Sequence, residues 1–90
     1  MLVDQTVTIV NPAGLHARPS GALVATAMGF ESELRIYMGE REVNGRSILE
    51  LITLGANCGS KLRLVADGED ASELMEALVC LIAAGFSEMG

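Results

Sequence analysis

The sequence predicts an α+β protein in which helices cover one face of an antiparallel sheet. Four short segments alternate apolar with polar residues, a pattern typical of strands that bury a single face. Three other segments repeat apolar residues at helical spacing. Along the chain the predicted order is βαββαβα. Strands with one apolar face form an antiparallel sheet that is open to water on one side, so the helices should lie together on the other side.

The four predicted strands are defined by alternation and by the turns that follow them. They cover residues 6–10, 33–38, 42–44 and 61–66. Clusters of Asn, Pro, Gly and Asp end the segments, as is usual for turns. The residues expected to face the core are Val7, Ile9, Leu34, Ile36, Met38, Leu62, Leu64 and Ala66.

The first predicted helix runs from His16 to about Met28. Its apolar residues, four apart along the chain, are Leu23, Val24, Ala27 and Met28. This stripe belongs to the core rather than to a ligand site. Gly29 is expected to end the helix in the left-handed conformation that glycine tolerates best.

Two capping boxes predict where the other helices begin. Ser47 with Glu50 opens a short helix that ends at Gly55, and Asp70 with Glu73 opens the third helix. Ser47 would be favoured there for helix stability alone, by about 1 kcal/mol. The buried face expected for the third helix consists of Leu74, Ala77, Leu78, Leu81, Ile82, Gly85 and Phe86.

Length and composition limit the classes of function. Residues 1–90 suffice for a single domain with one core. The net charge is −6 and the six basic residues are scattered, which argues against nucleic acid or an anionic membrane surface and favours protein partners. The longest uncharged run is shorter than the roughly 20 residues that span a bilayer, and no secretory signal pattern opens the chain. We therefore expect a cytoplasmic protein without membrane insertion.

The two cysteines, Cys58 and Cys80, lie far apart without a second cysteine or a histidine at metal-binding or redox spacing. Reduced thiols are the simplest interpretation for a cytoplasmic protein. The cysteines therefore predict neither a metal site nor a disulfide.

The only histidine, His16, falls where the first helix begins. A helix leaves its first four N–H groups unpaired and carries roughly half a positive charge at that end. With His16 at the N-cap, its ring would stand near the amides of Ala17 and Arg18, and the Arg18 guanidinium could pair with phosphate oxygens. Pro19 fits the first helical turn. Because a neutral imidazole is nucleophilic, this arrangement is suited to carrying a phosphoryl group on a ring nitrogen.

Two other interpretations of His16 remain open from the residues alone. In a small interaction module His16 would only cap the helix, and in a hydrolase it would activate Ser20, one turn later. The hydrolase interpretation lacks an orienting acid and a nucleophile elbow. Replacing His16 with Ala separates a carrier from a binding module. The carrier would lose its phosphorylation while staying folded, whereas the binding module would keep its partners.

Two blocks of sequence resemble a known family. Residues 11–20, Asn-Pro-Ala-Gly-Leu-His-Ala-Arg-Pro-Ser, resemble the active-site signature of HPr, the histidine-containing phosphocarrier of the bacterial phosphotransferase system. Residues 46–51, continued by Leu54-Gly55, resemble its regulatory serine region. The interval between the blocks, the total length and the Gly68-Glu69-Asp70 turn also match, so the resemblance covers essentially the whole chain.

The resemblance implies a fold, a function and partners. The fold is the open-faced β-sandwich, with strand order 1-4-2-3 and all three helices on one face. His16 accepts a phosphoryl group on Nδ1 from the phosphohistidine of enzyme I and passes it to the IIA domains of sugar permeases. Arg18 balances the added charge, and the backbone amides of Ala17 and Arg18 bind phosphate oxygens. Such a protein is a carrier rather than an enzyme, acts as a monomer and needs no cofactor or metal.

Ser47 matches the serine that an HPr kinase/phosphorylase modifies in many bacteria, and Arg46 matches the basic residue common before it. The resemblance thus adds this enzyme, and a transcriptional regulator, to the expected partners. A phosphate on Ser47 would bring nearly two negative charges to the docking face and slow phosphorylation of His16.

The residues expected to dock partners by resemblance are Ile48, Leu49, Gly21 and Val24. Two adjacent large apolar residues at a helix start are hard to bury together, so we expect one of Ile48 and Leu49 to be buried and the other exposed.

Three positions on the docking face depart from the family pattern. Ala25, Met28 and Glu50 stand where many HPr proteins have lysines, which leaves this face nearly neutral or acidic. Electrostatic steering towards an acidic enzyme I would then be weak. Either the partner is more apolar, or the chain is a specialised paralogue such as one of the nitrogen-regulatory branch.

Overall fold

The computed structural model of the protein describes residues 1–88. In chain order its elements are β1 (Leu2–Thr8), α1 (Ala17–Ala27), β2 (Glu33–Met38), β3 (Arg41–Asn44), α2 (Ile48–Thr53), β4 (Lys61–Asp67), α3 (Ala71–Ala83) and a 3-10 turn, η1 (Gly85–Ser87). The order is the predicted βαββαβα, with the 3-10 turn following the last helix. Within residues 1–88 no helix combines the length and the apolar content needed to cross a bilayer.

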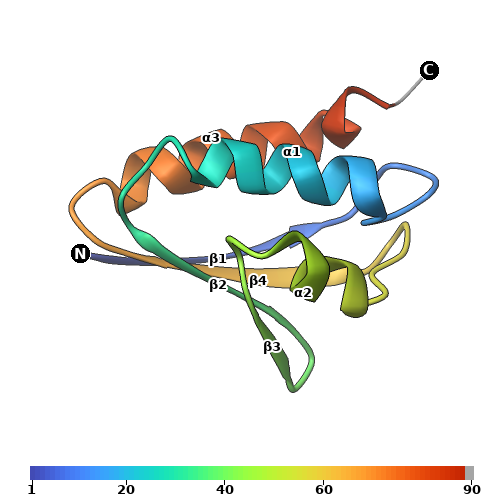
Figure 1. Cartoon of the computed structure of the whole chain (residues 1–90), viewed down its shortest axis with the longest axis horizontal. Coiled ribbons are helices and arrows are strands. Elements are labelled where there is room, and N and C mark those ends of the chain that lie inside the picture. Colours follow the sequence, from blue (N-terminus) through green and yellow to red (C-terminus); the bar gives the residue numbers. More distant parts are fainter. Residues whose placement is uncertain (89–90) are drawn as a thin grey trace.

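The four strands form one antiparallel sheet in the order β1-β4-β2-β3. Strand β4 is central, so its Ala66 lies opposite Val3 on one side and Leu34 on the other. Figure 1 shows α1 and α3 side by side across one face of the sheet, and α2 packs against α1 and β3. The predicted α+β class and the strand order implied by the resemblance are both confirmed.

The core lies between the sheet and the helices, and it is built from the predicted strand faces. β2 and β4 bury Leu34, Ile36, Leu62, Leu64 and Ala66, none more than 2% exposed. The helices contribute Leu23, Ala27, Leu51, Leu74, Leu78 and Ile82. Met38 and Val7 are half-buried at the margin of this core.

Strand β1 is displaced from its predicted range. It begins at Leu2 and ends at Thr8, because its whole length pairs with β4 from Leu2 opposite Asp67 to Thr8 opposite Lys61. Ile9 is fully buried just beyond the strand, where its N–H donates to the Ser60 carbonyl (2.9 Å) and its carbonyl accepts from Gly59 (2.7 Å). The prediction for Ile9 as a core residue is therefore confirmed, although its place within the strand is wrong.

Helix α1 begins and ends as predicted, with His16 and Met28 as its caps. Two details differ. Met28 is 63% exposed and does not belong to the core stripe. Gly29 is not among the residues with a positive φ, so it does not form the predicted left-handed cap. Instead, the Arg46 guanidinium donates to the carbonyls of Phe30 and Ser32 just past the helix, the end at which a cation is stabilising.

The two predicted capping boxes are only partly formed. The Ser47 hydroxyl accepts from the Glu50 N–H (3.2 Å), but the Glu50 carboxylate binds the Asn44 N–H (3.0 Å) instead of the Ser47 N–H. Asp70 is the N-cap of α3 yet makes no side-chain cap bond. Its carboxylate accepts from the backbone N–H groups of Glu31 (2.8 Å) and Ser32 (2.9 Å) and from the Ser32 hydroxyl. Asp70 therefore ties the α1–β2 connection to the start of α3.

The third helix is shorter than its apolar pattern predicts. It ends at Ala83, and Gly85 and Phe86 lie in the 3-10 turn with positive φ. Both residues are nevertheless buried, as predicted. The turn changes the direction of the chain while its apolar side chain continues to pack against the core.

Replacing Asp70 with Asn should weaken the acid dependence of stability. Hydrogen bonds from the Ser32 hydroxyl and the Glu31 backbone hold the pKa of Asp70 below its ordinary value of 3.8. Because the folded pKa is the lower one, the stabilisation is complete above about pH 4 and is lost as the pH falls through the folded pKa. Asp70→Asn should be less stable at neutral pH and lose less on acidification, measured by urea unfolding across this range. If the free energy of unfolding of wild type and variant fell equally with decreasing pH, Asp70 would not be the source of this acid dependence.

Candidate functional site

The loop that carries His16 is fixed by backbone contacts on both sides. The Leu15 N–H donates to the Ala56 carbonyl (2.9 Å), and the Leu15 side chain is 3% exposed. Gly14 has a φ of +74°, and a Cβ there would lie 2.4 Å from the Ala56 oxygen. Only glycine fits this close approach. The loop before α1 is therefore held firmly against residues 56 and 57, so His16 follows in a defined position.

The start of α1 leaves backbone donors unpaired. His16 is the N-cap, and Ala17 and Arg18 are the first two helical residues. Pro19 has no N–H, and the Ser20 N–H already donates to the His16 carbonyl (3.0 Å). The His16 side chain makes no capping bond, so the amides of Ala17 and Arg18 keep no partner within the helix. This arrangement is a ready site for an anion.

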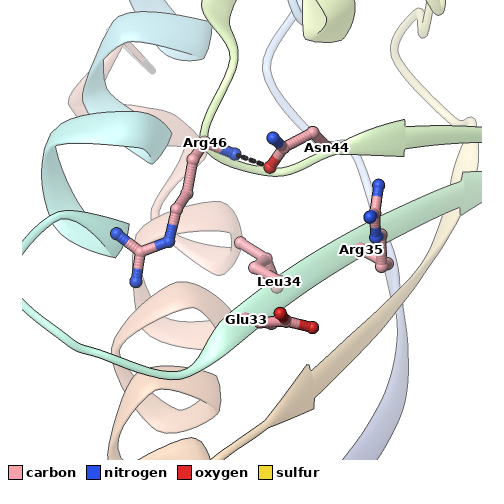
Figure 2. Close-up of a pocket in the computed structure, with 5 residues that line it drawn as sticks. All are labelled: Glu33, Leu34, Arg35, Asn44 and Arg46. Carbon is pink, nitrogen blue, oxygen red and sulfur yellow. Dashed lines mark hydrogen bonds between the residues drawn. The ribbon is translucent and has the colours of Figure 1, made fainter.

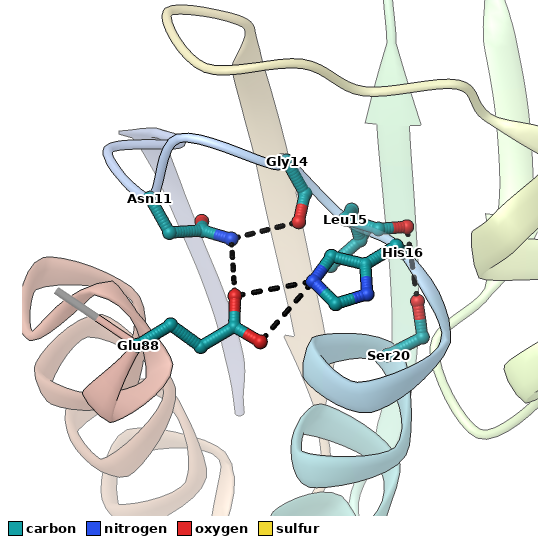
Figure 3. A network of polar contacts seen from close by, with 6 residues as sticks. All are labelled: Asn11, Gly14, Leu15, His16, Ser20 and Glu88. Carbon is teal, nitrogen blue, oxygen red and sulfur yellow. Dashed lines mark hydrogen bonds and ion pairs between the residues drawn. The ribbon is translucent and has the colours of Figure 1, made fainter.

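Ser20 does not serve as a nucleophile beside His16. It is buried, and its hydroxyl donates to the Leu15 carbonyl at 3.2 Å. Figure 3 shows this bond on the far side of the loop from the contacts of the His16 ring. The hydroxyl thus supports the helix start, and the structure gives the hydrolase interpretation no support.

The His16 ring lies at the surface with one nitrogen occupied. Its side chain is 44% exposed, and Nε2 lies 3.2 Å and 3.1 Å from the two carboxylate oxygens of Glu88. Figure 3 shows the other ring nitrogen, Nδ1, facing the first turn of α1. The nitrogen that the resemblance names as the acceptor is therefore the one on the side of the first turn of α1.

Asn11, in the loop before α1, contacts the same Glu88 carboxylate as the His16 ring. Its side chain is fully buried, and its Nδ2 donates to the Gly14 carbonyl (2.7 Å) and to Glu88 (3.0 Å). Its Oδ1 is buried without a hydrogen-bond partner among the described residues. Sequence reasoning missed both Asn11 and Glu88 as site residues. Asn11 resembles an ordinary turn residue, and Glu88 lies 72 residues from His16 with no pattern to join them.

Arg18 and Ala17, also predicted at the site, are exposed at the start of α1. The four ion pairs within residues 1–88 do not include Arg18. Its guanidinium therefore has its charge available for an anion at the helix start. The structure thus brings the predicted residues His16, Ala17 and Arg18 together.

Two of the predicted docking residues, Ile48 and Leu49, belong to a set of exposed apolar side chains on α2 and at the end of α1. We define this set, Met28, Ile48, Leu49 and Ile52, as the apolar patch. These side chains are 63%, 41%, 77% and 39% exposed. The prediction that one of Ile48 and Leu49 is buried was wrong, because Leu51 fills the core position of α2 instead. Gly21 adjoins the patch, since a Cβ there would lie 4.0 Å from the Ile48 Cδ1. Val24 is half-buried on the same helix.

A shallow hollow lies away from His16, between β2 and β3. It is lined by Glu33, Leu34, Arg35, Asn44 and Arg46, which Figure 2 shows from close by. The Arg46 guanidinium points out of it and is bound to the carbonyls of Phe30 and Ser32. Its charge therefore stabilises the end of α1 and is not available to a ligand. In the described part of the chain, no cluster of His, Cys, Asp and Glu could hold a metal ion.

Comparisons with known proteins agree with this geometry. The family model described as "PTS HPr component phosphorylation site" matches residues 3–84. Phosphocarrier protein HPr of Neisseria meningitidis serogroup A is 40% identical over 87 residues, which are 97% of this chain and 98% of the relative. Phosphocarrier protein NPr of Shewanella violacea is 35% identical over 86 residues, covering 96% and 94% of the two chains.

A solved structure extends the agreement to the fold. HPr-C-His from Thermoanaerobacter tengcongensis superposes with a TM-score of 0.93 at 38% identity, over 98% of this chain and 99% of that one. The match of the family model, the whole-length relatives and the superposition all concern the chain from β1 through α3. The chain therefore belongs to the HPr family, the phosphocarrier proteins of the phosphotransferase system.

Proposed function

We propose that the chain carries a phosphoryl group on Nδ1 of His16, which it accepts from the phosphohistidine of enzyme I and passes to IIA domains of sugar permeases. The observation that carries this proposal is the position of the ring. It is 44% exposed, its Nε2 is bound by Glu88, and its Nδ1 faces the first turn of α1, where the amides of Ala17 and Arg18 have no partner within the helix. A phosphoryl group on Nδ1 would lie between the backbone amides of Ala17 and Arg18 and the solvent, from which a partner protein can dock.

For phosphoryl transfer, this chain has to position the His16 ring and stabilise the charge of the phosphoryl group. The lone pair of Nδ1 forms the new N–P bond while the N–P bond of the donor phosphohistidine breaks, and the donor imidazole leaves. Transfer of this kind depends mainly on alignment and electrostatic stabilisation. The amides of Ala17 and Arg18 and the Arg18 guanidinium supply charge and hydrogen bonds to the phosphoryl oxygens. The chain then acts as a carrier, not an enzyme, and uses no cofactor or metal.

We also propose where the protein acts and with what. It is a monomeric single domain covering residues 1–90 in the cytoplasm, and its only partners are other proteins. The net charge of −6 supports the exclusion of nucleic acid.

Replacing His16 with Ala should abolish phosphorylation and leave the fold intact, because the ring is exposed and makes no cap bond. The measurement is incubation with phosphoenolpyruvate and enzyme I, followed by detection of an acid-labile, alkali-stable phosphate. Circular dichroism of both proteins serves as the folding control. A variant that is phosphorylated as fast as the wild type would contradict the proposal, and a wild type that takes up no phosphate would favour an interaction module.

The same assay separates the sugar branch from the nitrogen-regulatory branch, our second candidate. The lack of positive charge at three positions favours the latter, since Ala25, Met28 and Glu50 are all exposed and none of them is basic. Faster phosphorylation by enzyme I of the nitrogen-regulatory system than by enzyme I of the sugar system would assign the chain to that branch.

We also propose that partners dock on the apolar patch. Leu49 is the most exposed residue of the patch. A buried apolar anchor at the centre of an interface commonly contributes about 1–2 kcal/mol or more.

Leu49→Ser should therefore raise the KM for transfer from phospho-enzyme I about tenfold, because 1.4 kcal/mol corresponds to a factor of ten. Leu2→Ser is the matched control, since Leu2 is 62% exposed on β1, away from the patch. Steady-state kinetics of both variants make the test. An unchanged KM for Leu49→Ser, or an equal rise for Leu2→Ser, would rule the patch out as the docking surface.

Ser47 is proposed as a regulatory phosphorylation site for an HPr kinase/phosphorylase, with a transcriptional regulator as a reader of the modified form. Its hydroxyl lies at the N-cap of α2, directly before the patch residues Ile48 and Leu49. A phosphate there would place negative charge beside the docking surface and compete with the Glu50 N–H contact.

Ser47→Asp should slow phosphorylation of His16 by roughly tenfold, because like charges facing each other across an interface cost up to several kcal/mol. Ser47→Ala should transfer normally and lose about 1 kcal/mol of stability with its cap bond. Ser72→Asp on α3 adds the same charge elsewhere and should transfer normally. Rates for Ser47→Asp that equal those of Ser72→Asp would leave Ser47 with a capping role alone.

A further inference from the structure

Glu88 contacts the His16 ring, but the transfer step described above gives its carboxylate no chemical role. It lies beyond residue 84, where the match of the family model ends. Its side chain is only 17% exposed, and both carboxylate oxygens lie within 3.2 Å of Nε2. Asn11 holds the same carboxylate from the protein side, through a bond of 3.0 Å from its buried amide. The carboxylate is therefore fixed between the ring and the loop.

The backbone before Glu88 is strained in a way that produces this contact. Gly85, Phe86 and Ser87 have successive φ values of +63°, +56° and +62°. Left-handed residues other than glycine are disfavoured by roughly 1–2 kcal/mol each and rarely occur in series. The turn is held by bonds from Ser87 to Ala84 (3.2 Å) and from Glu88 to Gly85 (2.9 Å), and by the buried Phe86 side chain.

Strained backbone of this kind persists only where surrounding contacts enforce it, and it concentrates at functional sites. A right-handed continuation of α3 would carry the chain onward in the direction of the helix. The left-handed turn instead bends the chain, and Figure 3 shows the Glu88 side chain extending towards Asn11 and the His16 ring. The contact with His16 thus follows directly on Phe86 and Ser87, the only non-glycine residues with positive φ within residues 1–88.

An ionised carboxylate can only accept hydrogen bonds, so its contact with Nε2 requires the proton of a neutral ring to reside on Nε2. The lone pair is then left on Nδ1, which faces the start of α1. In the opposite tautomer, the lone pair of Nε2 would face the carboxylate and repel it. The hydrogen bond made by one ring nitrogen determines the state of the other.

We propose that Glu88 is a positioning residue for His16, which fixes the Nε2–H tautomer and so makes Nδ1 the nucleophile. This inference rests on the proposed role of His16 as the phosphoryl acceptor. As Nδ1 bonds to phosphorus, the ring keeps its Nε2 proton and acquires positive charge, and the carboxylate stabilises that charge. The same contact favours onward transfer, because the protonated ring is the better leaving group when the N–P bond breaks.

The direct test is the tautomer of His16, read from the ring 15N chemical shifts at alkaline pH, where the ring is neutral. The wild type should show Nε2–H almost alone. Glu88→Ala should show a mixture of both tautomers, and Glu88→Gln should lie between them, since a carboxamide can accept or donate. Unchanged tautomer populations in Glu88→Ala would overturn the proposal, whatever the transfer rates.

The second readout is the rate at which phosphoramidate, a small phosphoryl donor that needs no partner protein, phosphorylates the ring. In this reaction the donor N–P bond breaks and ammonia leaves. In metal sites, loss of the partner that orients a ligand histidine typically costs 10–100-fold, and His16 is half exposed, so we expect Glu88→Ala to react about tenfold more slowly, at the lower end of that range. An equal rate would overturn the proposal. A faster rate would also overturn it, because Glu88 would then only shield the ring.

Glu40→Ala and Glu40→Gln are the matched controls. Glu40 is exposed in the β2–β3 turn and takes part in none of the four ion pairs within residues 1–88. Both controls remove the same charge and should match the wild type in tautomer and rate. A wild type that phosphoramidate and phospho-enzyme I both leave unmodified would refute the proposed function, while the 15N shifts would still decide whether Glu88 sets the tautomer.

Discussion

The unpaired amides at the beginning of α1 are the constraint on which the rest of this site depends. Ala17 and Arg18 contribute the donors. Pro19 has no N–H, and the Ser20 N–H already donates to the His16 carbonyl. The loop before them cannot move freely, since Gly14 and Leu15 are bound against Ala56. A partial positive charge is therefore fixed beneath an exposed imidazole, and an anion bound to that ring is stabilised without any rearrangement of the chain.

The two ring nitrogens of His16 have different surroundings. Glu88 binds Nε2, and Nδ1 faces the first turn of α1. Two charged groups thus act on the ring from different sides, with a carboxylate that stabilises positive charge in the ring and a helix start that stabilises negative charge on a phosphoryl group. In the proposed function partners dock on the apolar patch, whose residue Ile48 lies near Gly21 of α1, the helix that His16 caps.

The sequence predicted the fold class, the element order and most of the core, because alternation and helical spacing report directly on buried faces. It also predicted that His16 caps the first helix, and the structure confirms this position. The errors concern contacts that no local pattern encodes. Glu50 binds Asn44 rather than closing its box with Ser47, and Asp70 leaves its own helix to bind Glu31 and Ser32, because tertiary partners outcompeted the local ones. Glu88 could not be predicted, since the left-handed turn that places it interrupts an apolar pattern that favours a continued helix.

The most direct measurement is a 15N–31P correlation spectrum of the phosphorylated, uniformly 15N-labelled protein, recorded together with its backbone amide spectrum. Phosphorus should couple to Nδ1 of His16, and the amides of Ala17 and Arg18 should show the largest shifts. Coupling to Nε2, or amide shifts that spare the start of α1, would contradict the proposed transfer on Nδ1.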